Sequence, residues 1–388
     1  MKYLGVLLLL AARCFGATYY VRTGGNDSCD GTVPVLGTSG ACAWKTVGHA
    51  ISSHSSGDTV YVGGGTYREA GLNIASNMNL LGDPLGGWTG DQGVVTVTGY
   101  TTSDTSAPSS STLLTVTGTT ATTVSDLYLI GTGSSGSTTL NLISNPTGLT
   151  LRRVIFSSNV NSLQGVFGQF STGSLNILFD RCVFAGGVPC IRFNPLEESV
   201  DYSLGITIQN SMWMGTSADL LEVVSLTNGA NTGLGGGVLV YNSTFEQVVD
   251  ANGINVSAVS GTFPVTIYNS YFHLIKSGGD AMIANIAGQI SEDYNFLDSN
   301  IPYVNVTQGP HSVINPNMSP RVDNGLALLF PAVYRCQAMF SLLAVSPMVG
   351  YGNHAGGPTV DITGKTRPNP ASVGALEAAS GCPQGSRW

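Results

Sequence analysis

Three aspartates hold matching positions in consecutive stretches of the chain. Asp219, Asp250 and Asp280 each precede a short apolar segment, in the sequences ADLLEVV, VDANGINV and GDAMIANI. If these segments are neighbouring strands, the carboxylates form a column with a spacing of about 4.8 Å. Like charges this close must bind a cation, share protons or point apart. The column therefore predicts a Ca²⁺ site or a pair of acids acting on a polysaccharide. Alternatively, each aspartate caps the turn before its strand.

An aromatic pair is the second candidate for chemistry. Tyr241 and Tyr268 occupy the same place in the related segments VLVYNSTF and VTIYNSYF, and His273 follows the second tyrosine. Stacked, exposed tyrosines on a flat sheet would form a platform for sugar rings, with His273 beside them as an acid or base. Alternatively, the pair is ordinary cross-strand stacking, which contributes about 0.2–1 kcal/mol.

The elements that must position these residues come from a repeated motif of alternating apolar residues, a polar pair and an aromatic. Its copies are LTLRRVIF (149–156), ILFDRCVF (177–184), ITIQNSMW (206–213), VLVYNSTF (238–245) and VTIYNSYF (265–272), with a fainter copy at 122–131 and a decayed one at 290–296 ending at Phe296. The alternation places Val265 and Ile267 inside, with Thr266 and Tyr268 outside. Short strands that cannot bury their own apolar face must stack as a solenoid, and Gly-rich turns with β-branched strands favour parallel β-helix coils.

Aligning the copies predicts two rows of equivalent positions along the stack. One row faces outward and could bring Arg152 and Asp180 together as an ion pair; it consists of Arg152, Asp180, Gln209, Tyr241 and Tyr268. The other row lies at the bend after each strand, and its amides are expected to bond along the stack; it consists of Asn210, Asn242, Asn269 and Asp293.

Composition excludes several classes of protein. The 388 residues include 51 glycines, and only 10% are charged, with 15 Lys and Arg against 23 Asp and Glu. Low charge and 42% hydrophobic residues are not typical of a disordered chain. A net charge of −8 disfavours nucleic acid as a partner, because phosphate binding requires an excess of cations.

The two ends of the chain resemble a known family. The segments TYYVRTGGNDSCDGT, CAWKTVGHAI and GDTVYVGGGTYRE (18–69) look like the start of secreted pectin-lyase-like β-helix proteins, and 344–377 is similar to a C-terminal segment of bacterial surface β-helix proteins. The resemblance implies an all-β, right-handed parallel β-helix with a short N-terminal capping helix. The expected units are a cap with the first coil (17–70), coils (71–300), and C-terminal coils, cap and tail (301–388).

The resemblance also implies an activity. Lyases of this fold remove a proton from C5 of a uronic acid with a basic residue, while Ca²⁺ or arginine neutralises the carboxylate. Lys276 and Arg192 are the candidates for these roles, with Asp250 as the third catalytic candidate. Alternatively, Lys276 is solvated in a turn. We therefore expect an exported polysaccharide-directed protein, a lyase or glycoside hydrolase if it is an enzyme, with a non-catalytic glycan-binding or adhesion protein as the alternative.

Export is predicted from the N-terminal residues. Residues 1–16 read as a signal peptide, with Lys2 before an apolar stretch that is too short to span a bilayer, and no later stretch is a membrane span. The expected location is outside the cytoplasm: secreted, on the cell surface or in the periplasm. Beyond Cys14, the spacing suggests the disulfides Cys29–Cys42, Cys182–Cys190 and Cys336–Cys382, with buried free thiols as the alternative.

Overall fold

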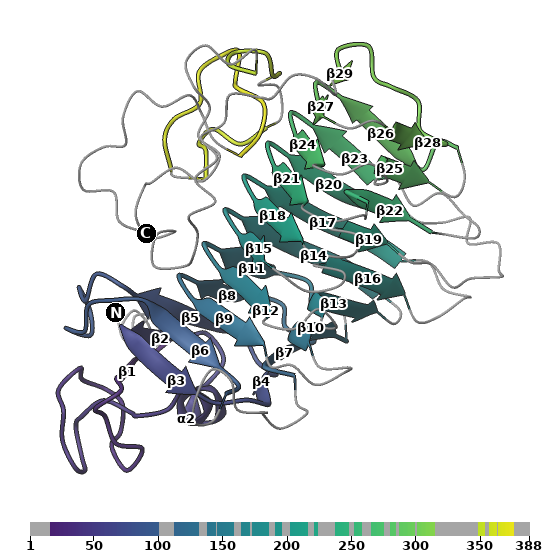
Figure 1. Cartoon of the computed structure of the whole chain (residues 1–388). Helices are drawn as coiled ribbons and strands as arrows, with labels where there is room; N and C mark the ends of the chain where they lie inside the picture. The colour runs from purple at the N-terminus through teal and green to yellow at the C-terminus, as the bar shows by residue number, and fades with distance from the viewer. Residues whose placement is uncertain are drawn as a thin grey trace, which may run out of the picture.

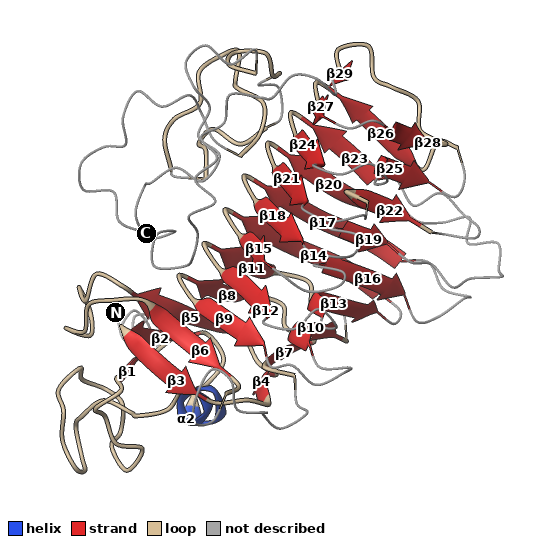
Figure 2. Ribbon diagram, viewed as in Figure 1, coloured by secondary structure: helices blue, strands red, loops and turns tan. Residues whose placement is uncertain are grey.

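The structure is a computed structural model in which part of the chain can be described. The described residues are 16–100, 112–131, 138–144, 146–158, 164–170, 173–185, 191–195, 202–215, 221–223, 237–247, 252–257, 265–274, 280–284, 287–298, 301–314, 348–353, 357–362 and 364–375. Among them, the named strands pair in parallel throughout, and the single helix α2 (Val47–Ser53) is too short to cross a membrane (Figure 2).

The strands form three long sheets, to which each complete coil contributes one strand apiece (Figure 1). Sheet A consists of β1 (Thr18–Val21), β2 (Asp58–Gly63), β5 (Met78–Asp83), β8 (Thr122–Ser125), β11 (Leu149–Arg152), β14 (Gly173–Asp180), β17 (Tyr202–Gln209), β20 (Gly237–Tyr241), β23 (Val265–Tyr268) and β26 (Ile290–Asp293). Sheet B consists of β3 (Gly65–Arg68), β6 (Val95–Thr98), β9 (Tyr128–Gly131), β12 (Ile155–Ser158), β15 (Val183–Ala185), β18 (Met212–Gly215), β21 (Thr244–Gln247), β24 (Tyr271–Leu274), β27 (Phe296–Asp298) and β29 (Val313–Ile314). Sheet C consists of β4 (Leu72–Ile74), β7 (Leu114–Thr117), β10 (Thr138–Ile143), β13 (Gln164–Phe170), β16 (Ile191–Pro195), β19 (Leu221–Val223), β22 (Ile254–Val256), β25 (Asp280–Ala284) and β28 (Ile301–Val304).

The chain passes from sheet A to B to C and back to A, so each strand pairs with its equivalent one coil later. Parallel strands joined by such a crossing adopt the right-handed connection. The fold is a right-handed parallel β-helix, which confirms the fold class expected from the repeats. The expected capping helix is present as α2. Its first turn is closed by Thr46, whose side chain accepts from the His49 N–H, and by the Glu69 carboxylate, which accepts from Val47 and Gly48.

Alternating side chains fill the interior of the β-helix as predicted. Val265 and Ile267 are fully buried, whereas Thr266 and Tyr268 are partly exposed. On the inner side of sheet B the repeat aromatics stack face to face, and their ring centroids are 4.2–5.2 Å apart; this stack is Phe156, Phe184, Trp213, Phe245 and Phe272. Offset stacking adds to the apolar area that these rings bury.

The prediction for the last repeat is wrong by one residue. Leu297, not Phe296, follows Phe272 in the stack, and Phe296 pairs with Tyr271 and contacts Tyr351 of the C-terminal segment. The turn in this coil is made by Tyr294, with a φ of 56°, so Asp293 belongs to the outward row beside Tyr268. The register follows the left-handed turn residue, because that residue fixes where the chain passes from sheet A to sheet B.

The row of turn residues between sheets A and B has a left-handed backbone in each coil from 126 to 294; it consists of Asp126, Arg153, Arg181, Asn210, Asn242, Asn269 and Tyr294. Asparagine suits this conformation. The expected amide ladder along the stack is not formed. Instead, Asn242 donates to Ser372 O and Asn269 donates to Asn353 O, so these amides hold the C-terminal segment.

Serines take the role that was expected of the amides. Each serine that follows a turn asparagine accepts a hydrogen bond from the backbone N–H of the equivalent residue in the preceding coil: Cys182 N–H to Ser211, Ser211 N–H to Ser243, and Ser243 N–H to Ser270. These side chains are fully buried, and the bonds satisfy backbone donors that no strand neighbour reaches.

The cysteine pairing is confirmed for one bond. Cys29 and Cys42 form a disulfide in the N-terminal loop. The Cys182–Cys190 pairing is wrong, because Cys182 forms no disulfide. It lies between β14 and β15, fully buried, and its thiol donates to Leu151 O, whereas residue 190 immediately precedes β16 on another sheet. Burial raises the pKa of the Cys182 thiol to about 12, which keeps it protonated. Cys336 and Cys382 lie outside the described residues.

Candidate functional site

The outer side of sheet C carries a continuous row of aligned positions. From the N-terminal end this row, which we call the sheet C row, consists of Asn73, Thr115, Asn141, Phe167, Arg192, Glu222, Asn255, Ile283 and Val304. Asn73, Thr115, Asn141, Arg192 and Asn255 all have partly or fully exposed side chains. The row thus offers amides, a hydroxyl and a guanidinium, at intervals of one or two strand spacings of about 4.8 Å, to a ligand lying along the helix axis.

Arg192 is the cation of this row. Its neighbours in β16, Ile191 and Phe193, are buried in the core, with at most 1% of either residue exposed. Because side chains alternate along a strand, Arg192 must face away from the interior. A guanidinium in this position presents donors in a fixed fork that matches a carboxylate. The structure therefore places the predicted catalytic arginine on an accessible face.

Asp280 begins β25 on the same sheet. Its backbone N–H donates to the side-chain oxygen of Asn252 at 3.1 Å, so Asn252 is the residue beside it in the preceding coil. Its Oδ1 is buried and accepts no hydrogen bond from the residues that the structure describes. Burial raises the pKa of this carboxyl. A buried, unsatisfied carboxylate oxygen is costly by itself and is suited to a cation or to a ligand hydroxyl.

A shallow pocket lies at the C-terminal end of the sheet C row. It encloses about 350 Å³. It is lined by Asn255, Val256, Ser257, Ile283, Ala284, Val304 and Asn305. The Asn305 amide donates to Ala284 O at 3.0 Å, which fixes one wall. The polar lining residues are uncharged, so the pocket is suited to hydroxyl groups rather than to ions.

Three of the predicted site residues lie outside the described residues: Asp219, Asp250 and Lys276. In the chain, however, each falls between a strand of sheet B and the next strand of sheet C, at the connections β18–β19, β21–β22 and β24–β25. Arg192 and Asp280 lie on sheet C itself. In the sequence, every predicted catalytic and metal residue therefore lies within, or two to four residues before, a strand of sheet C. Within the described part of the chain, no cluster of three or more His, Cys, Asp or Glu residues could hold a metal ion.

The predicted sugar platform lies on a different face. Tyr241 and Tyr268 project from sheet A and stack with centroids 6.0 Å apart. His273 lies on sheet B, beyond the left-handed turn at Asn269, and its Nδ1 is 2.7 Å from an Asp298 oxygen. His273 therefore does not lie beside the tyrosine pair, and the predicted residues do not converge in one cleft among the residues described.

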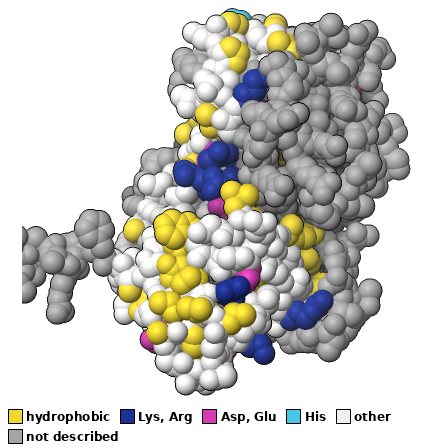
Figure 3. Space-filling model, turned by 90° about the vertical axis from the view of Figure 1, so that its left-hand side faces the viewer, with side chains coloured by type: hydrophobic (Ala, Val, Ile, Leu, Met, Phe, Trp, Pro, Cys, Tyr) yellow, Lys and Arg dark blue, Asp and Glu magenta, His cyan; other side chains and the backbone are white. Residues whose placement is uncertain are grey.

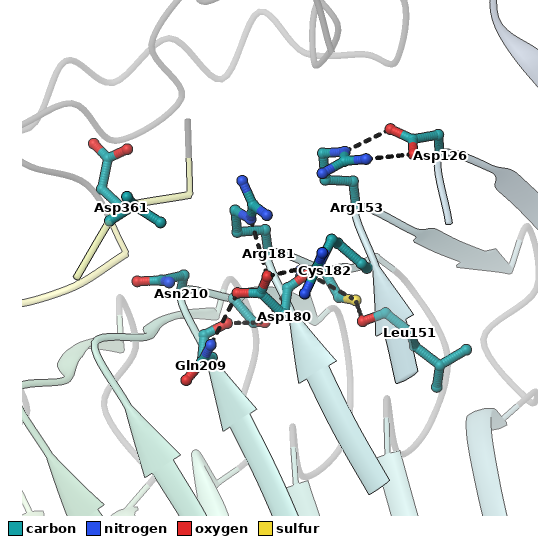
Figure 4. A network of polar contacts seen from close by, with 12 residues as sticks. Asp126, Leu151, Arg153, Asp180, Arg181, Cys182, Gln209, Asn210 and Asp361 are labelled. Carbon is teal, nitrogen blue, oxygen red and sulfur yellow. Dashed lines mark hydrogen bonds and ion pairs between the residues drawn. The ribbon is translucent and has the colours of Figure 1, made fainter. Parts of the chain in front are cut away.

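The outward row of sheet A confirms the predicted register of Arg152, Asp180, Gln209, Tyr241 and Tyr268. Figure 4 shows its charged centre. Arg152 Nε and Arg181 Nε approach Asp180 Oδ2 at 3.2 and 3.1 Å, and Gln209 donates to the other oxygen. Arg153 binds Asp126 through two hydrogen bonds of 2.5 Å. Three arginines therefore share two carboxylates.

The sequence analysis missed the N-terminal end of this row. Tyr20 and Tyr61 are aligned across β1 and β2, their rings stack with centroids 6.1 Å apart, and Trp88 stacks on Tyr61 at 4.7 Å. The signal was available in TYYV and TVYV, where a tyrosine occupies the outward position of both strands. Trp88 lies in a loop, so no repeat pattern could have placed it there.

Comparison with known proteins gives similarity to solved structures only. No family model matches the chain, and no curated protein matches it. Among solved structures it is similar to the pectate lyase Pel9A, at 14% identity over 94% of this chain and 97% of that chain, with a TM-score of 0.45. It is similar to a pectin methylesterase from carrot, at 10% identity over 77% and 88% with a TM-score of 0.41, and to a rhamnogalacturonan lyase, at 12% identity over 72% and 87% with a TM-score of 0.39.

The three parallel sheets and the row of left-handed turns define this chain as a right-handed parallel β-helix protein. Identities of 10–14% do not carry residue roles from the solved structures to this chain. β-Helices host unrelated activities, so the function must be argued from the site.

Proposed function

We propose that this protein is an exported β-helix protein that binds an extended polysaccharide along the outer face of sheet C. The observation that supports the proposal is the sheet C row, in which Asn73, Thr115 and Asn141 hold successive strand positions, and Arg192 and Asn255 follow at every second strand. Sugar rings in an extended chain follow one another at a similar distance. The pocket beside Asn255 and Asn305 would accept one further ring. The disulfide Cys29–Cys42 supports export, because disulfides persist in oxidising compartments.

Uronic acid units are the proposed substrate class. Arg192 would bind the carboxylate of one unit, while the amides of Asn141 and Asn255 would bind hydroxyls. The named neighbours include a pectate lyase and pectin methylesterases, which is consistent with this class. In a cell, such a protein would meet its ligand outside the cytoplasm.

Replacing Arg192 with alanine should weaken binding of an oligo-uronate by roughly 10–100-fold, since a charge-assisted hydrogen bond contributes about 1.5–3 kcal/mol. Isothermal titration calorimetry with oligogalacturonate would measure the change. Arg68→Ala is the matched control, because Arg68 is an exposed arginine on sheet B. Equal affinities of Arg192→Ala and the wild-type protein would contradict the proposal, as would equal binding of a neutral oligosaccharide.

The acidic residues support Ca²⁺ as a partner of this face. Asp280 has the donor type that Ca²⁺ prefers, and its buried Oδ1 has no hydrogen bond that a cation would need to displace. We propose that Asp280, with Asp219 and Asp250, holds the ion, which would supply a positive charge for a substrate carboxylate.

Asp280→Asn should lower the affinity for Ca²⁺ at least tenfold, because the substitution removes one negative charge while it keeps the side-chain shape. Calorimetric titration of EDTA-treated protein measures this. Asp298→Asn is the control, since Asp298 lies on sheet B and contacts His273. If the wild-type protein takes up no Ca²⁺, or if both variants match it, the cation site is wrong.

Catalysis is the second candidate, and the location of Lys276 favours it. In the sequence, Lys276 precedes β25, a strand of the sheet that carries Arg192, by four residues. In a lyase reaction, the Lys276 amine would take the C5 proton of a uronate, the C–H electron pair would form the C4–C5 double bond, and the C4–O bond would break, with the leaving oxygen taking a proton. Ultraviolet absorbance of the unsaturated product tests this. Its absence, together with the absence of new reducing ends, would leave the non-catalytic glycan-binding protein.

A further inference from the structure

An aromatic surface on the N-terminal coils is not used by the proposed sheet C site. Tyr20 and Tyr61 stack along the outward row of sheet A, and the indole of Trp88 covers Tyr61 with an interplanar angle of 13°. Trp88 is 57% exposed, and Leu85 in the same loop is 54% exposed. Large apolar side chains exposed as a group mark interaction sites more often than isolated ones do.

The loop that carries Trp88 is held rigidly although its tip is exposed. The buried carboxylate of Asp83 accepts hydrogen bonds from the backbone N–H groups of Gly87, Trp88 and Thr89 at 2.7–2.9 Å, and from the Thr89 hydroxyl. Arg22 forms two hydrogen bonds with Asp91 near the other end of the loop. The fold therefore fixes an indole ring in solvent without burying it, and such preorganisation reduces the entropy cost of binding a ligand.

Cationic side chains lie farther along the same face. The backbone register carries the outward row from Tyr61 through Leu81 and Ser125 to Arg152, which is three strands or about 14 Å away. The Arg152 side chain is 43% exposed and shares Asp180 with Arg181. Figure 3 shows a hydrophobic patch and, beside it, a group of Lys and Arg side chains on this face.

The turn row has the same left-handed backbone in these coils as in the later ones, but the residue type differs. Arg153 and Arg181 adopt φ angles of 52° and 59°, where the next three coils use asparagine. A left-handed conformation costs an arginine about 1 kcal/mol or more relative to residues that accept it. Arg153 binds Asp126 and Arg181 binds Asp180, so both turn arginines add positive charge beside Arg152.

We propose that Tyr20, Tyr61, Trp88 and Arg152, which we call the aromatic–arginine strip, form a second binding site for an acidic glycan, separate from the sheet C face. The apolar C–H faces of sugar rings would stack on Trp88 and Tyr61. A carboxylate on a unit farther along the chain would bind the exposed guanidinium of Arg152. Charge complementarity at the Arg152 end favours an acidic glycan, because Arg152, Arg153 and Arg181 share only two carboxylates, those of Asp126 and Asp180. The inference shares its ligand class with the proposed function but not its residues.

Tryptophan fluorescence isolates this site. The chain has four tryptophans, of which Trp44 and Trp213 are buried, Trp88 is exposed and Trp388 lies outside the described residues. In a Trp388→Phe protein, acrylamide should therefore quench Trp88 selectively. Oligogalacturonate should protect that fluorescence at least twofold, and a neutral oligosaccharide of equal length should protect it less. A further Trp88→Phe substitution should remove the quenchable component. Unchanged quenching in saturating oligogalacturonate would overturn the inference.

Binding by variants separates the strip from the sheet C site. Trp88→Ala and Arg152→Ala should each weaken oligogalacturonate binding at a second, calorimetrically resolved site by roughly tenfold or more. The exposed residues Tyr351 and Arg68 provide the controls Tyr351→Ala and Arg68→Ala. Arg192→Ala should leave the strip intact. Loss of binding in Arg192→Ala alone would overturn the strip while supporting the sheet C site. Loss in the strip variants alone would do the reverse, and equal binding of a sulfated polymer would reduce the strip to a nonspecific polyanion surface.

Discussion

Trp213→Ala should lower the free energy of unfolding by about 4 kcal/mol, one of the largest losses from a single substitution in this protein. Trp213 is fully buried, and its ring lies between those of Phe184 and Phe245, at 5.1 and 4.2 Å. Removing it leaves a cavity in the middle of the stack. Because each coil contacts only its neighbours, the loss should separate the β-helix into halves that unfold at different urea concentrations. Circular dichroism during urea unfolding measures both effects.

Trp213→Phe is the matched control for this prediction. The indole Nε1 of Trp213 is buried and has no hydrogen-bond partner in the described structure. Phenylalanine removes that unsatisfied donor, worth about 1–3 kcal/mol, while it leaves a smaller void than alanine does. The two effects oppose each other, so the stability of Trp213→Phe should stay within about 1 kcal/mol of the wild-type value. If Trp213→Ala loses no more than Trp213→Phe, the stack does not stabilise the coils as argued.

Strand positions could be predicted from the sequence because the side-chain period of a strand is two. Once one inward residue such as Val265 is identified, its neighbours follow, and the outward row from Arg152 to Tyr268 was placed correctly. The error in the coil at 290–298 concerns the turn position, which was assigned to Asp293 but is occupied by Tyr294. Asparagine favours a left-handed turn conformation, whereas tyrosine does not, so the sequence gives no sign that Tyr294 forms the turn. An alignment on the aromatic Phe296 therefore shifts this repeat by one residue.

Relations between faces of the β-helix were harder to predict. Tyr268 and His273 are close in sequence, but the turn at Asn269 places them on different sheets. The partners of Asn210, Asn242 and Asn269 come from a segment 157, 130 and 84 residues later, respectively, which no local pattern reveals. The sequence was sufficient to select single candidate residues. Which of the three sheets carries each of them could be seen only in the folded structure.

The C-terminal segment depends on a buried arginine, and this makes Arg367 the second position with a large expected effect. Arg367 is 4% exposed. Its guanidinium donates to the Asn210 amide oxygen and to the carbonyl oxygens of Val360, Ser372, Gly374 and Ala375, at 2.9–3.3 Å. These bonds both shape the segment and attach it to the turn row. Arg367→Met keeps much of the aliphatic volume but leaves five acceptors, four of them buried, without this donor, so it should lower the free energy of unfolding by about 3 kcal/mol or more.

The loss at Arg367 should be local, which distinguishes it from the loss at Trp213. Hydrogen exchange should accelerate at Gly374 and Ala375, whose N–H groups bind Asn269 O and the Thr244 hydroxyl, while the strands of sheet A keep their protection. Lys365→Met is the control, because Lys365 lies in the same turn and is less buried. Faster exchange throughout the coils would mean that the segment stabilises the whole β-helix, and unchanged exchange in Arg367→Met would show that the segment docks without the arginine. Faster exchange at Gly374 and Ala375 alone is the result expected if Arg367 attaches the C-terminal segment to asparagine turns that fold without it.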